Sequence, residues 1–167
     1  MTYYIGIDQS YRSSGIIITN DQSEIVKQEI VSTLKDYGSY FRRAKIASES
    51  IASIVNTLDE YTDEDIHIGI EGLAHGIRSH TLQNLAGLQF MIVNAIEDMG
   101  FKVAVYTPST LKKFATGSGK GSKEDMFTAL PGKVQKMFES IPKSHGREDL
   151  VDAYWISRKV KDVVNNG

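Results

Sequence analysis

The chain has 167 residues, no cysteine and a formal net charge of −2. This length predicts a single domain spanning residues 1–167, and the lack of cysteine excludes a disulfide framework and a thiolate metal site. We find no signal peptide and no apolar run as long as a membrane span, so we expect a cytoplasmic protein that does not act at a membrane.

The chain begins with three predicted strands. Residues 3–8 (YYIGID) and 14–19 (SGIIIT) are short apolar runs joined by a turn-rich stretch. Residues 24–32 alternate like a strand with one solvent-facing side. Because the links between these runs are short, the three strands are expected to form an antiparallel meander.

Helices and strands then alternate along the chain. Apolar residues recur at helical spacing from about residue 40 to 58, and an acidic loop at 59–65 leads to a fourth strand at 66–71. The later elements are expected to be a helix over about 81–99 with Gly100 as its C-cap, a strand over 103–107, a short helix from Pro108, a helix opened by a Ser122–Asp125 capping box, and a closing helix over about 147–164.

This order of elements predicts an α/β fold, with a mixed five-stranded sheet and helices on both faces. In such sheets, ligands bind at the carboxyl ends of strands, near a switch in strand order. The residues that end strands are therefore the first candidates for a functional site.

Four carboxylates occupy positions that could converge. Asp8 and Glu71 each end a predicted strand, and Asp149 and Asp152 are three residues apart on one face of the closing helix. Acids near a helix N-terminus are also stabilised by the helix dipole, which is an ordinary structural explanation for the second pair. However, buried carboxylates are costly unless they are paired or bind a metal, and Mg²⁺ and Mn²⁺ prefer oxygen ligands. The pattern predicts a metal-dependent enzyme acting on a phosphodiester.

A basic segment accompanies these acids. Residues 1–101 hold 7 basic and 14 acidic side chains, whereas residues 102–147 hold 9 basic and 3 acidic ones. Residues 111–126 (LKKFATGSGKGSKEDM) combine lysines with a glycine-rich loop, whose backbone N–H groups could bind phosphate oxygens. The spacing is not that of a Walker A motif. Solvated lysine-rich helices and a flexible turn would give the same composition, so this segment alone leaves both interpretations open.

Taken in order, four segments resemble the RuvC-type Holliday junction resolvases of the RNase H-like superfamily. GIDQSYRSSG is similar to that family's GIDPGxxxTG, and IGIEGL to its second acidic strand. TPSTLKKFATGSGKGSKEDM resembles its loop-and-lysine segment, and HGREDLVDA its closing D-x-x-D-A. The resemblance covers nearly the full length, and its looseness would suit a phage-encoded relative.

The resemblance implies an RNase H-like nuclease that resolves four-way (Holliday) DNA junctions by paired nicks, through a two-metal-ion mechanism. It implies Mg²⁺ as the cofactor, with Mn²⁺ as a substitute. The carboxylates that would hold the ions are Asp8, Glu71, Asp149 and Asp152. The scissile phosphate would be held by Lys112 and Lys123, with weaker contacts to the DNA backbone from Lys113, Lys120 and Arg78.

The chain departs from the family pattern at two places. Gln9-Ser10 replaces the family's Pro-Gly, which we expect to matter little. The loop after Glu71, GLAHGIRSH, has no Phe or Tyr where bacterial members carry an aromatic residue that stacks on junction bases. Leu73 or Ile77 could serve as an apolar wedge instead. Selectivity for four-way junctions therefore stays open.

Paired nicks imply a symmetric homodimer. The helix expected over 81–99 is apolar around more than one stripe, so one stripe could face the sheet and another a twin helix. Burial on both sides within one chain is the alternative. The apolar residues of this helix are Leu82, Leu85, Leu88, Phe90, Met91, Ile92, Val93, Ile96 and Met99.

Two other functions remain open. One is a broader nuclease of the same fold that cleaves flaps, three-way branches or RNA. The other is a non-catalytic junction-binding module, although acids facing DNA phosphates would weaken such a binder. An actin-like ATPase is disfavoured, because one short domain leaves no second half to close over a nucleotide.

Overall fold

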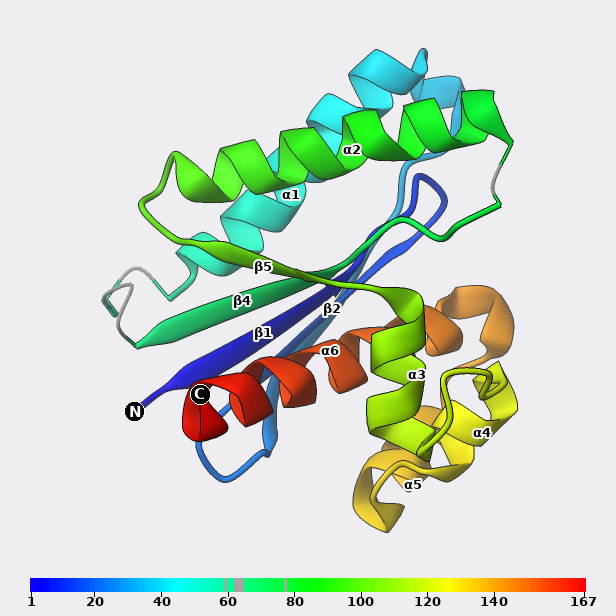
Figure 1. Ribbon diagram of the computed structural model, residues 1–167. Coiled ribbons are helices and arrows are strands. Elements are labelled where there is room, and N and C mark those ends of the chain that lie inside the picture. Colours follow the sequence, from blue (N-terminus) through cyan, green and yellow to red (C-terminus); the bar gives the residue numbers. More distant parts are fainter. Residues whose placement is uncertain (59, 62–64, 77) are drawn as a thin grey trace.

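The computed structural model describes residues 1–58, 60, 61, 65–76 and 78–167, and it shows a five-stranded sheet with helices on both faces (Figure 1). Ile77 and most of the expected acidic loop at 59–65 lie outside the described residues. The strands are β1 (Tyr3–Asp8), β2 (Ser14–Thr19), β3 (Ile25–Val31), β4 (Ile66–Glu71) and β5 (Val103–Tyr106). The helices are α1 (Tyr40–Asn56), α2 (Ser79–Glu97), α3 (Pro108–Thr116), α4 (Lys123–Thr128), α5 (Gly132–Glu139) and α6 (Arg147–Asn166), with short 3-10 helices at Lys35–Tyr37 and Lys143–His145.

The strand order is β3-β2-β1-β4-β5. β1 pairs with β2, and β2 with β3, in antiparallel fashion, whereas β1–β4 and β4–β5 are parallel pairs. This confirms the predicted meander and the predicted mixed sheet. Because β1 and β4 run in parallel, with Ile7 opposite Ile70, both strands end at the same edge of the sheet. Asp8 and Glu71 therefore lie at neighbouring strand ends.

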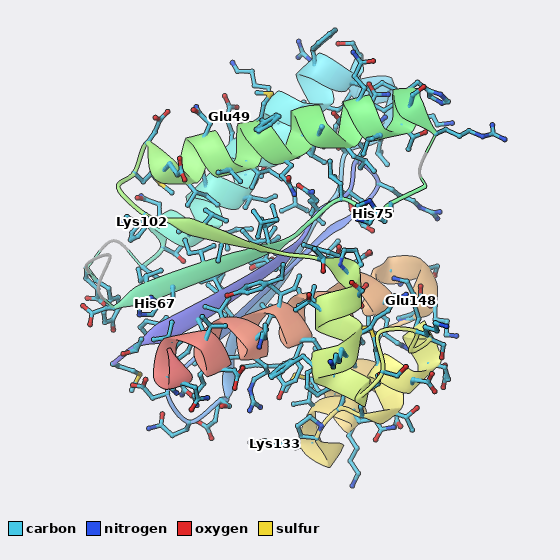
Figure 2. All side chains as sticks on the ribbon, in the orientation of Figure 1. Glu49, His67, His75, Lys102, Lys133 and Glu148 are labelled. Atoms are coloured by element: carbon cyan, nitrogen blue, oxygen red, sulfur yellow. The ribbon has the colours of Figure 1, made fainter. Side chains whose placement is uncertain are left out.

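Strand alternation sends these two acids to one face of the sheet. The core under α1 and α2 takes Ile5 and Ile7 from β1, and Ile68 and Ile70 from β4. Side chains fill the space between the sheet and this helical layer (Figure 2). Since successive residues of a strand point to opposite faces, Asp8 and Glu71 face the other layer, which contains α6. Figure 1 shows α6 lying along this second face, with α3, α4 and α5 grouped at one end of it.

Two glycines let α6 approach the sheet closely. A Cβ atom on Gly6 of β1 would lie 1.9 Å from the carbonyl oxygen of Ala153, and one on Gly15 of β2 would lie 2.3 Å from that of Asp149. Backbone therefore packs directly on backbone where α6 crosses β1 and β2. This contact places the first turns of α6 over the strand end that carries Asp8.

Three expectations about individual elements need correction. The C-cap of α2 is Asp98 and not Gly100, which lies two residues further on with a φ of 94°. The fifth strand stops at Tyr106, because Thr107 is the N-cap of α3 and its side chain accepts a hydrogen bond from the Thr110 N–H. α5 was not expected; its buried Val134 and Phe138 pack against α6. The Ser122–Asp125 capping box is confirmed.

α2 buries one side and exposes another. Leu88, Ile92 and Ile96 are fully buried against the sheet layer, whereas Phe90 is 73% exposed and Met91 and Leu82 are partly exposed. An apolar surface thus remains on the outside of this helix. Within the described residues, none of the helices combines the length and apolar character needed to cross a membrane.

Candidate metal-binding active site

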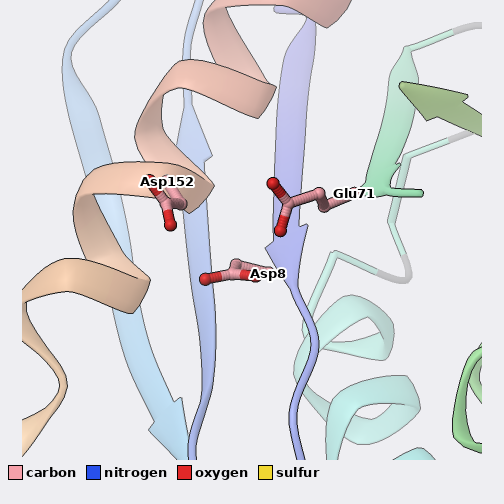
Figure 3. Close-up of side chains that lie close together, drawn as sticks. All are labelled: Asp8, Glu71 and Asp152. Atoms are coloured by element: carbon pink, nitrogen blue, oxygen red, sulfur yellow. The ribbon is translucent and has the colours of Figure 1, made fainter. Parts of the chain in front are cut away.

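Three carboxylates from three different elements form one cluster. Asp8 ends β1, Glu71 ends β4, and Asp152 lies in the second turn of α6; each contributes an oxygen atom, and these atoms all lie within 4.8 Å of one another (Figure 3). Asp8 and Asp152 are each only 7% exposed, and Glu71 is half-buried. Three acids at this distance and depth form a set of oxygen donors of the kind that a divalent cation needs.

The fourth predicted carboxylate lies beside this cluster. Asp149 is half-buried one turn before Asp152 on α6, and its Oδ2 accepts a hydrogen bond from the Ser13 hydroxyl at 2.5 Å. Among the described residues, the group whose oxygens meet within 4.8 Å contains Asp8, Glu71 and Asp152 but not Asp149. The negative charge of Asp149 still raises the pKa values of Asp8 and Asp152.

Burial dominates the electrostatics of the cluster. The pKa of Asp8 is raised well above its ordinary value of 3.8, first by burial and then by the charges of Asp152 and Glu71. Burial also raises the pKa of Glu71 and of Asp152, although Lys123 opposes the shift at both sites. A buried group of like charges favours either protonation or a bound cation. The donor atoms and the excess negative charge of the cluster therefore fit a divalent metal ion.

Lys123 is the cation nearest to the cluster. Its Nζ lies 2.9 Å from Oδ2 of Asp152 and 4.0 Å from Oε2 of Glu148. Burial lowers the pKa of Lys123, but the carboxylates around it, Asp152 foremost, together more than offset this effect and raise the pKa overall. The pKa of Asp152 is nevertheless also raised, because its own burial outweighs one partly exposed ammonium group. Lys123 is thus held, charged, at the rim of the acidic cluster.

A cavity of about 260 Å³ adjoins the carboxylates. Its lining includes Glu71 and Asp152, both predicted lysines Lys112 and Lys123, and the half-buried Leu73. The other predicted DNA contacts, Lys113, Lys120 and Arg78, are exposed side chains that do not line it. The structure therefore brings two of the five predicted basic residues to the acids.

Two glutamines that the sequence analysis did not assign to the site support Glu71. Nε2 of Gln89 on α2 donates to the Glu71 carbonyl oxygen at 2.9 Å, and Nε2 of Gln9 donates to the same oxygen at 3.4 Å. These bonds connect the end of β4 with the turn after β1 and with α2. No local pattern identifies such residues, because the contact joins positions 18 and 62 residues apart.

The turn after β1 is firmly held. The Tyr11 hydroxyl donates to the Asn84 carbonyl oxygen of α2 at 2.8 Å, and the buried Arg43 guanidinium donates to the Tyr11 carbonyl oxygen at 3.3 Å. The Arg43 guanidinium carbon also lies 5.2 Å from the centre of the Tyr11 ring. The segment that follows Asp8 is thereby tied to both helices of the opposite layer.

The raised pKa values predict how the stability of the metal-free protein depends on pH. A carboxylate whose pKa is higher in the folded than in the unfolded state binds more protons when folded, so its contribution to stability is lost as pH rises through the folded-state pKa. For Asp8, Glu71 and Asp152 the window begins near the ordinary values of 3.8 and 4.5 and extends upward. We expect the melting temperature in EDTA to fall as the pH rises above the ordinary values of these groups, as measured by circular dichroism.

Asp125 and Asp162 have lowered pKa values, so their contributions are lost at the acid end, below this window. Adding Mg²⁺ or Mn²⁺ at the upper end should restore the melting temperature, because a ligand that binds only the folded state stabilises it. A melting temperature that rises with pH in EDTA would show that the cluster does not carry the predicted charge.

Comparison with known proteins gives structural matches only. No protein-family model matches the chain, and no curated protein does. The structure is similar to that of Thermus thermophilus RuvC, with 16% sequence identity, a TM-score of 0.77 and coverage of 99% of this chain and 97% of that one. It is also similar to T. thermophilus RuvC in complex with a Holliday junction substrate, with 15% identity, a TM-score of 0.78 and coverage of 100% and 97%. The chain therefore has the RNase H-like fold of RuvC over its full length, as the sequence resemblance implied.

Proposed function

We propose that this chain with the RuvC fold is a metal-dependent endonuclease that resolves four-way DNA junctions by paired phosphodiester nicks. The observation that carries the proposal is the buried cluster of Asp8, Glu71 and Asp152, with Lys123 bound to it at 2.9 Å. The cluster lies at the carboxyl ends of β1 and β4, where α/β sheets bind their ligands. A non-catalytic binder would gain nothing from buried acids facing DNA phosphates.

The donor set supports Mg²⁺ as the cofactor, with Mn²⁺ as a substitute, because both ions prefer carboxylate oxygens. Asp8, Glu71 and Asp152 would hold the metal, and Asp149 would add a fourth carboxylate. When bound, a pair of such ions supplies an activated water and stabilises the leaving oxygen of an in-line displacement. The packing of α6 on the sheet keeps Asp8 and Asp152 largely out of bulk water.

The lysines would position the substrate. Lys112 and Lys123 lie on the wall of the cavity beside the carboxylates, where they can hold the scissile phosphate and offset the charge that develops on it. Lys113, Lys120 and Arg78 would bind neighbouring phosphates, which positions the DNA without reading its sequence. Leu73 or Ile77 would act as the apolar wedge at the branch point.

Two nicks placed symmetrically need two active sites, so we infer a homodimer. The exposed apolar side of α2, with Phe90 at its centre, is the surface that supports this inference. The opposite side of the same helix is already buried in the core, so it is the outer side that remains for a second copy.

Cleavage of a labelled synthetic four-way junction tests the proposal, with a flap, a three-way fork and a linear duplex assayed alongside. We expect symmetric nicks near the branch point with Mg²⁺ and none with EDTA. A broader branched-DNA or RNA nuclease is the second candidate, because the loop after Glu71 lacks an aromatic residue. Equal cutting of all branched substrates would establish that candidate. Tight junction binding with no cutting in Mg²⁺ would instead identify a binding module.

A further inference from the structure

Within the described part of the chain, the Asp149 side chain has a hydrogen-bond partner in Ser13, whose hydroxyl donates to Oδ2 at 2.5 Å. Resting on the proposed nuclease function, we propose that Ser13 is a positioning residue that holds Asp149 as a ligand of a second, weaker metal site beside the Asp8–Glu71–Asp152 cluster. The sequence pattern of the RuvC-type resolvases specifies no residue at this position. The motif alone therefore does not explain this bond, which gives the fourth carboxylate a defined partner.

The backbone of Asp149 has little freedom to move. A Cβ atom on Gly15 would lie 2.3 Å from the Asp149 carbonyl oxygen and 2.5 Å from its carbonyl carbon, so the helix backbone is in close contact with β2 here. Only rotation of the side chain can bring the carboxylate toward the other three acids or away from them. Ser13, two residues before Gly15 in the chain, is the group that sets this rotation.

Ser13 is itself fixed by a network of serines. Its N–H donates to Oγ of Ser10 at 2.9 Å, and that hydroxyl donates to the Ser13 carbonyl oxygen at 2.7 Å. The Ser14 hydroxyl donates to the Ser10 carbonyl oxygen at 2.9 Å. Together with the anchoring of Tyr11, these bonds make the turn a rigid platform. A hydroxyl on such a platform can hold a carboxylate in one orientation.

The remaining bonding capacity of Asp149 points to a cation. The Ser13 bond engages Oδ2, and a carboxylate can accept at both oxygens. A hydroxyl that donates to Oδ2 leaves the other carboxylate oxygen able to bind a metal ion. Hydrogen-bond partners of ligating carboxylates typically affect metal affinity by about 10–100-fold.

Isothermal titration calorimetry of the DNA-free protein with Mn²⁺ distinguishes the two metal sites by their affinities. For the wild type we expect two ions per chain with different affinities. Ser13→Ala should weaken the second site by about 10–100-fold and leave the first within about threefold, because the three-acid cluster keeps its own contacts. Ser13→Thr, which keeps the hydroxyl, should restore the second site, and Asp149→Asn should remove it. Ser53→Ala, at an exposed serine of α1, is the matched control and should bind like the wild type.

Cleavage gives a second readout. Ser13→Ala should need about 10–100-fold more Mg²⁺ for half-maximal cleavage, while its rate at saturating Mg²⁺ stays near that of the wild type. Equal binding of both ions by Ser13→Ala and the wild type would overturn the role of Ser13, as would a wild type that binds one ion only. If the Mn²⁺ results are as expected but no junction is cut, the proposed function fails and the role of Ser13 stands. If the wild type cuts junctions but Ser13→Ala binds both Mn²⁺ ions normally, the proposed function stands and the role of Ser13 fails.

Discussion

Replacement of Asp8 by asparagine should abolish metal-dependent cleavage while the protein stays folded and still binds DNA. Asp8 is buried, and the charges of the other three acids all raise its pKa. The amide keeps the size of the side chain but loses the charge that a cation needs. Bound metal contributes several kcal/mol to the transition state, so the cleavage rate should fall at least about 1,000-fold.

Glu49→Gln is the control for this substitution, because it makes the same chemical change, from carboxylate to amide, at an exposed residue of α1. Among the described residues, Glu49 forms an ion pair with Lys45 on the same helix, at 3.4 Å. Glu49 lies in the helical layer on the other side of the sheet from Glu148, which neighbours Lys123 at the acidic cluster (Figure 2). Junction cleavage and gel-shift binding should be unchanged in this variant. Asp8→Asn should also raise the melting temperature of the metal-free protein near neutral pH, since it removes a buried charge. Cleavage that survives Asp8→Asn would exclude the cluster as the catalytic centre.

Replacement of Gly6 by alanine should destabilise the protein strongly. The added Cβ would lie 1.9 Å from the Ala153 carbonyl oxygen and 2.5 Å from the Ser157 backbone nitrogen, and neither atom can move unless α6 moves. Overpacking that shifts backbone typically costs about 1–3 kcal/mol, and we expect the upper end of this range here because two backbone atoms are approached. Displacing α6 would also carry Asp152 away from Asp8, so cleavage should fall with stability. Urea denaturation measures the change in the free energy of unfolding.

Gly87→Ala provides the comparison for Gly6→Ala. Gly87 lies within α2, and an added Cβ there would meet no atom within 4 Å. Alanine is a better helix former than glycine, so we expect no loss and a gain of up to about 1 kcal/mol. If Gly6→Ala and Gly87→Ala unfold at the same urea concentration, the close contact between α6 and β1 is not a constraint on the fold.

The sequence predicted the strand ends of the site well, for physical reasons. The apolar runs before Asp8 and Glu71 are short, strongly β-forming and bounded by turns, so their ends are sharply defined. Once the two strands pair in parallel, strand alternation alone sends both acids to the same face. The spacing of Asp149 and Asp152 likewise placed them on one side of a helix.

Contacts between residues far apart in the chain leave no local pattern in the sequence from which they could be predicted. Helical spacing gave Asp149 and Asp152 equivalent positions, but their partners differ. Ser13 binds Asp149 from 136 residues away, and Lys123 binds Asp152 from 29 residues away. Gln89 supports Glu71 from a helix whose apolar pattern suggested only packing and dimerisation. α5 was missed because its eight residues are too few to show a helical period clearly.

The glycine contacts beneath α6 also bear on how such a protein can diverge. The separation between Asp8 and Asp152 depends on two main chains in contact at Gly6. Volume-conserving substitutions in the cores can leave this contact in place, provided that no side chain is added at Gly6 or Gly15. A chain only 16% identical to RuvC can then keep a closely similar backbone. Gly6 and Gly15, which have no side chain, are therefore expected to be among the positions least tolerant of substitution.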